Sequence, residues 1–109
     1  MIRHIVFFTA RDTADLPRIV EGLELLGQIP HSDHFEVVQN AKVDQFGNDV
    51  DVIVYAEFAD ETALAAYKAH PIYAEATRRV RPLRELRYAA DFTARKGAAF
   101  ETQALRRTA

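Results

Sequence analysis

The chain has 109 residues, of which 49% are hydrophobic and 28% charged, as in an ordinary globular domain. It has no cysteine, which excludes disulfides, thiolate nucleophiles and zinc–thiolate sites. The net charge of −2 is uneven: residues 1–60 hold 4 basic and 11 acidic residues, a balance of −7, and residues 61–109 hold 10 and 5, a balance of +5.

Several classes of protein do not fit these numbers. The longest apolar runs are only a few residues, such as Ile5 to Phe8, so no membrane span is expected. The start of the chain lacks the long apolar region of a signal peptide, and we expect a cytoplasmic protein. The overall negative charge disfavours nucleic acid as a partner, so the arginines of the second half are interpreted as a solvated face.

The first expected element is a strand over residues 2–9, rich in β-branched and aromatic side chains. Its two-residue period places Ile2, His4, Val6 and Phe8 on one face, and Ile5 and Phe7 on the other. Both faces are largely apolar. This is typical of a strand that is covered on both sides.

A helix is expected to begin between Asp12 and Asp15, with Pro17 in its first turn, and to end near Gly27. Its apolar stripe recurs at three- and four-residue steps. The later elements are strand 34–39, hairpin loop 44–49, strand 50–58, helix 61–69 capped by Asp60, helix 72–80 after Pro71, and strand 84–93. Residues 94–109 are expected to form an arm or tail outside a domain of residues 1–93.

The order β-α-β-β-α-β predicts an α+β protein with a ferredoxin-like antiparallel sheet. Helices on one sheet face leave the other face bare, yet the strands are apolar on both faces. A homodimer that closes two sheets face to face, a dimeric α/β barrel, resolves this conflict.

Four segments resemble the stress-responsive dimeric α/β-barrel (Dabb) family. They are Ile2 to Phe8, Tyr55 to Phe58, Ala65 to Tyr73, and Asp91-Phe92. The Tyr-x-x-His-Pro run within the third segment is the most specific, and the similarity covers residues 1–93. The resemblance implies a ferredoxin-like fold, a dimeric barrel and a pocket between sheet and helices. It also implies a link to stress responses, and in one member the cofactor-free cyclisation of a linear polyketide.

The cyclase-type site of that family implies roles for particular residues here. Tyr67 matches its tyrosine, His4 its first-strand histidine, and His70 and Pro71 its His-Pro step. Tyr73 stands where the family's general base, a histidine, is expected. Because tyrosine titrates near pH 10, it is a poor base at neutral pH, so His4 is the better proton-transfer group.

Each of these residues also has a structural interpretation. His4 can also be a core histidine satisfied by a hydrogen bond, and Tyr67 can equally be a core aromatic whose hydroxyl reaches solvent. His70 lies at a helix break, where its ring can cap backbone groups. Tyr73 is a candidate to line the pocket and donate a hydrogen bond.

The sequence therefore favours a homodimer that binds or transforms a small apolar or phenolic molecule without a cofactor, and it leaves open whether the chain is an enzyme. Two alternatives remain. One is a non-catalytic stress or interaction protein, and the other is a cofactor-free monooxygenase, which the absence of tryptophan disfavours. No metal site is expected, because His31 and His34 lack a third ligand at a recognised spacing.

Overall fold

The computed structural model describes residues 1–95; residues 96–109, which include most of the expected arm, lie outside the described part. The elements in chain order are β1 (Ile2–Ala10), η1 (Thr13–Asp15), α1 (Leu16–Glu24), η2 (Leu25–Gln28), β2 (His34–Gln39), β3 (Val52–Phe58), α2 (Glu61–Ala69), α3 (Pro71–Val80) and β4 (Arg84–Thr93). This order confirms the expected β-α-β-β-α-β pattern, with the second helical segment divided in two.

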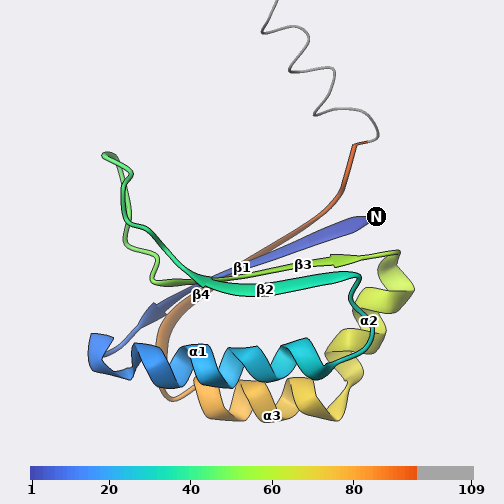
Figure 1. The fold of residues 1–109 in the computed structure, drawn as a ribbon, viewed down its shortest axis with the longest axis horizontal. Coiled ribbons are helices and arrows are strands. Elements are labelled where there is room, and N and C mark those ends of the chain that lie inside the picture. Colours follow the sequence, from blue (N-terminus) through green and yellow to red (C-terminus); the bar gives the residue numbers. More distant parts are fainter. Residues whose placement is uncertain (96–109) are drawn as a thin grey trace, which may run out of the picture.

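The four strands form one antiparallel sheet in the order β2-β3-β1-β4. Figure 1 shows α1 and α3 side by side on one face of this sheet, with α2 at its end. The arrangement is the predicted ferredoxin-like α+β fold. Among the described helices, none is long and apolar enough to cross a membrane.

The core lies between the sheet and the helices. Along β1 and β3, alternate residues are buried, and the buried ones face the helix layer. Val54, Ala56 and Phe58 of β3 are at most 1% exposed, and Ile19 of α1 is fully buried against them. His4 is buried in the same layer at 1% exposure, which singles it out among apolar neighbours.

The opposite sheet face, here called the open face, carries no helix. The register places Phe7 of β1 between Ile53 of β3 and Tyr88 of β4 on this face. Tyr88 is 61% exposed and Phe92, on the same face, is 46% exposed. The apolar alternation of β4 therefore points away from the helices, which leaves Arg87 and Asp91 on the helix side.

Two element boundaries differ from the predictions. The strand expected from Val50 begins at Val52, although the backbone of Asp51 still bonds to Phe8 and Asn40. The helix expected to reach Gly27 changes at Leu25 into the tighter turn η2, a frequent ending for α-helices.

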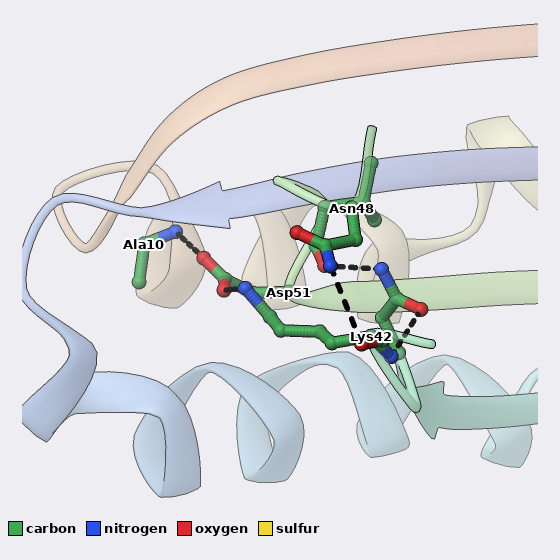
Figure 2. Close-up of polar contacts among 6 residues, drawn as sticks. Ala10, Lys42, Asn48 and Asp51 are labelled. Carbon is green, nitrogen blue, oxygen red and sulfur yellow. Dashed lines mark hydrogen bonds and ion pairs between the residues drawn. The ribbon is translucent and has the colours of Figure 1, made fainter. Parts of the chain in front are cut away.

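Asp51 ties the loop of residues 40–51 to the sheet (Figure 2). Its carboxylate accepts a hydrogen bond from the backbone N–H of Ala10 at 2.9 Å and pairs with the Lys42 ammonium at 2.9 Å. Burial alone would raise the pKa of Asp51, but the bonds from Ala10 and Lys42 outweigh it and lower the pKa. The carboxylate thus stays ionised and holds the loop that Figure 1 shows projecting from the open face.

We expect Asp51→Ala to lower the free energy of unfolding by about 1–3 kcal/mol, because it leaves the buried Ala10 N–H without its partner. Urea unfolding at pH 7 measures this. The matched control is Asp49→Ala, whose carboxylate is exposed, with an expected change within about 0.5 kcal/mol. Equal losses in the two variants would contradict the anchoring role.

Candidate functional site

A cavity of about 260 Å³ lies between the helix side of the sheet and helices α1 and α3. Much of its wall is apolar and comes from β1, β3, α1 and α3, with Val6, Phe8 and Leu23 among the lining residues. Its polar lining is confined to one histidine, two tyrosines, one threonine and three arginines. An apolar cavity with a few convergent polar groups is the usual form of a small-molecule site.

His4, which lines this cavity, forms a pair with Asp91, which lies outside the lining. They face each other across β1 and β4, and His4 Nδ1 lies 2.5 Å from Asp91 Oδ1. The His4 side chain is 2% exposed, whereas that of Asp91 is 34% exposed. The carboxylate accepts a hydrogen bond from the Nδ1–H group. This assigns the neutral ring the Nδ1–H tautomer, in which Nε2 carries a free lone pair.

The electrostatic balance at His4 favours the neutral ring. Burial lowers the pKa of His4 from its ordinary value of 6.5, and the hydrogen bond and charge of Asp91 only partly offset this effect. Lys68 and Arg87 add further positive charge that lowers the pKa. A neutral imidazole with an oriented partner is the form in which histidine accepts a proton.

The lowered pKa predicts a dependence of stability on pH. The unfolded chain binds a proton at His4 more readily than the folded chain does, so this contribution to stability is present above pH 6.5 and is lost as the pH falls through the folded pKa. Nitrogen-detected NMR titration of His4 should give a midpoint below 6.5, and Asp91→Asn should lower it further. Urea unfolding should show a steeper loss of stability below pH 6.5 in the wild type than in His4→Gln. A midpoint above 6.5 would contradict this account.

Tyr67 of α2 and Tyr73 of α3 complete the inner part of the cavity. The Tyr67 ring packs at its edge against His4, with centroids 6.1 Å apart, and against Tyr73 at 5.4 Å. Tyr67 is fully buried, yet its hydroxyl has no hydrogen-bond partner among the described residues. Because burying an unpaired hydroxyl is costly, this group is the strongest local sign of a ligand or ordered water. Burial also raises the pKa of Tyr67, so the hydroxyl stays protonated.

His70 is not brought to the cavity. Its Nδ1 accepts a hydrogen bond from the Ile72 N–H at 3.1 Å and caps the first turn of α3, while its ring packs against His31. The helix break at Pro71 requires such a cap. Of the four residues singled out in the sequence, His4, Tyr67 and Tyr73 line one cavity and His70 supports the helix next to it.

Two residues of this site were not identified from the sequence. Asp91 stands there only in a segment that resembles the family, and Arg87 is one of the second-half arginines interpreted as a solvated face. The sequence feature that could have identified them is their alternation with the apolar residues of β4, which places both on the same face of the strand. Only the pairing of β4 with β1 shows that Asp91 lies opposite His4.

The five arginines between residues 78 and 87 form two sets. Arg78 and Arg79 on α3 both pair with Glu75, at 2.6 and 2.8 Å, on the outer surface. Arg81, Arg84 and Arg87, here called the cavity arginines, line the cavity. The arginines interpreted as a solvated face thus lie partly on the outer surface of α3 and partly at the cavity.

The described residues contain no cluster of three or more histidines and carboxylates suited to a metal ion. His31 packs against His70, and His34 lies 3.6 Å from Glu36, so these two histidines have different neighbours. The chemistry that the cavity residues themselves can perform is proton transfer at His4 and hydrogen-bond donation at Tyr67.

A ferredoxin-like sheet with a lined cavity beneath its helices defines the class of protein as a small α/β-barrel domain. The family model of the stress responsive A/B barrel domain, Dabb, matches residues 2–94, and the chain belongs to this family. Comparison with curated proteins gives no match.

Solved structures share the fold. A Dabb family protein with a ferredoxin-like fold from Mesorhizobium loti is 27% identical, with a TM-score of 0.73 over 86% of this chain and 96% of that one. A dimeric ferredoxin-like protein of unknown function from Thermobifida fusca is 25% identical, with a TM-score of 0.72 over 85% and 90%. An antibiotic biosynthesis monooxygenase is 15% identical, with a TM-score of 0.67 over 87% and 99%, a likeness that extends to the fold alone.

Proposed function

We propose that the chain is a homodimer whose cavity binds a small apolar or phenolic carbonyl compound and moves a proton within it without a cofactor. The observation that carries this proposal is that buried His4, held by Asp91, and Tyr67, whose hydroxyl has no partner among the described residues, line one cavity. Perturbed titratable groups in an apolar cavity are characteristic of acid–base sites.

The proposed step begins at His4. Nε2 removes a proton from the carbon next to a ligand carbonyl, and the electron pair of that C–H bond moves onto the carbonyl oxygen as an enolate. Tyr67, kept protonated by its raised pKa, donates a hydrogen bond to this oxygen as the negative charge develops. Asp91 holds the imidazolium that forms.

The proton then leaves His4 in one of two balanced ways. Return to a different carbon of the enolate gives an isomer. Attack of the enolate carbon on a second carbonyl of the same molecule forms a carbon–carbon bond, and the resulting alkoxide takes the proton from His4, which gives a ring. Tyr73, in place of the family's basic histidine, lines the cavity as a hydrogen-bonding group and leaves the base role to His4.

The proposed homodimer is supported by the open face and by one neighbour. The exposed aromatic residues Tyr88 and Phe92 would be an unusual solvent surface for a monomer of this size. The Thermobifida fusca protein of the same fold is described as dimeric. Two open faces packed together would bury these side chains as the two sheets of a sandwich do.

The proposal can be tested before the substrate is known. Incubation of the protein with aryl 1,3-diketones and aryl methyl ketones in D₂O, followed by NMR, measures exchange of the hydrogens next to the carbonyl. We expect the wild type to accelerate exchange of a cavity-binding ketone about 10²–10⁴-fold over His4→Gln, which keeps the residue polar but cannot act as a base. Equal rates for both proteins would reject proton transfer at His4 and favour the non-catalytic interaction protein.

A further inference from the structure

The cavity arginines differ from the paired arginines of the helix surfaces. Arg78 and Arg79 share Glu75, and Arg18 lies 3.4 Å from Asp15. Within residues 1–95, by contrast, no ion pair involves Arg81, Arg84 or Arg87. The charges of Arg78 and Arg79 are thus neutralised on α3, whereas no carboxylate of residues 1–95 neutralises the three cavity arginines.

Three elements hold these groups together. Arg81 is the C-cap residue of α3, and Arg84 and Arg87 lie in the first half of β4. Arg87 extends to the cavity tyrosine Tyr73, with Nη2 3.5 Å from the hydroxyl. Arg11 adds a fourth cation from the end of β1, because its Nε donates to the Arg84 carbonyl at 2.9 Å.

The concentration of like charge is unfavourable in the protein alone. Burial lowers the pKa of Arg84, and the charges of Arg87, Arg81 and Arg11 lower it further. Like charges at this density repel one another unless an anion sits among them. Guanidinium groups match the two oxygens of a carboxylate or the oxygens of a phosphate with paired hydrogen bonds.

We propose that the ligand of the cavity is an oxyanion: its apolar body lies against the β1 and α1 wall, and a carboxylate or phosphoester group is held by Arg81, Arg84 and Arg87. This inference rests on the proposed ligand site and specifies its substrate class. The charged group of the ligand lies at the arginine end, and its reactive carbonyl lies at the end lined by His4 and Tyr67.

The test uses three probes with the same apolar body: 4-phenylbutyrate, the neutral 4-phenylbutyramide and 3-phenylpropyl phosphate. Isothermal titration calorimetry measures each against the wild type, the double variant Arg84→Gln/Arg87→Gln, and the matched control Arg78→Gln/Arg79→Gln, which removes the same charge from the outer surface. His4→Ala, at the inner end, reports whether a probe occupies the cavity.

We expect at least one acidic probe to bind the wild type more tightly than the amide does. Its dissociation constant should rise about tenfold or more in Arg84→Gln/Arg87→Gln and stay within about twofold in the control. A preference for the butyrate over the phosphate, or the reverse, distinguishes the two oxyanions.

Three outcomes overturn the inference in different ways. If acid and amide bind equally and the arginine variants affect neither, the ligand is not required to be an anion. The proposed ligand site would then still stand. Acid binding that is weakened equally by both double variants and unchanged in His4→Ala places the anion on the outer surface. No binding of any probe, in a protein that also fails to exchange ketone hydrogens in D₂O, rejects both the inference and the proposed function.

Discussion

Tyr88→Glu is expected to convert the proposed dimer into monomers. Tyr88 lies opposite Phe7 on the open face, on the edge strand β4, and is 61% exposed in the single chain. In the single chain a carboxylate at this position remains in water and costs little. In a face-to-face dimer it would be buried without a partner, which costs several kcal/mol per ion.

Light scattering coupled to gel filtration measures this effect. The wild type should have about twice the chain mass of 12.3 kDa, and Tyr88→Glu should have the mass of one chain at micromolar concentration. A loss of about 3 kcal/mol corresponds to a dissociation constant roughly a hundredfold higher. Tyr88→Phe, which keeps the ring, should remain dimeric, and so should Thr62→Glu, which adds the same charge to exposed α2. A dimeric Tyr88→Glu would place the interface elsewhere.

Tyr67→Phe is expected to separate ligand binding from stability. The change removes a buried hydroxyl that has no partner among the described residues, so the free energy of unfolding should stay the same or rise by about 1 kcal/mol. A ligand that accepts this hydrogen bond should lose about tenfold or more in affinity. Few core substitutions are expected to weaken function without weakening the fold.

Tyr55→Phe is the matched control for that variant. The Tyr55 hydroxyl donates to Glu57 at 2.6 Å on the open face, away from the cavity. Its loss should lower stability by about 1 kcal/mol and leave ligand affinity unchanged. If Tyr67→Phe proves as destabilising as Tyr55→Phe with no effect on binding, the Tyr67 hydroxyl has a structural partner and is not a ligand contact.

Much of the fold followed from local patterns. The two-residue period of β1 correctly separated the buried set that includes His4 and Val6 from the set that includes Phe7. Asp60 was expected to cap a helix, and its carboxylate accepts the Ala63 N–H at 2.9 Å. These features depend on near neighbours in the chain, which a sequence displays directly.

The site was only partly predictable. The resemblance to the Dabb family indicated roles for His4 and Tyr67, but it gave no role to Asp91, whose position opposite His4 depends on the register between β1 and β4. Strands far apart in sequence pair through tertiary packing, and a shift of one residue would turn Asp91 to the other face. The same limit applied to the arginines, because only the fold separates Arg84 at the cavity from Arg78 on the surface.

The central claim is that His4 and Tyr67 belong to a ligand site. A thermal-shift screen of phenolic, polyketide-like and acidic aromatic compounds, run in parallel on the wild type and His4→Ala, tests it most directly. The account predicts at least one compound that raises the melting temperature of the wild type and has little effect on His4→Ala, because saturating a site stabilises the folded state that forms it. Compounds that stabilise both proteins equally, or no stabilising compound at all, would contradict it.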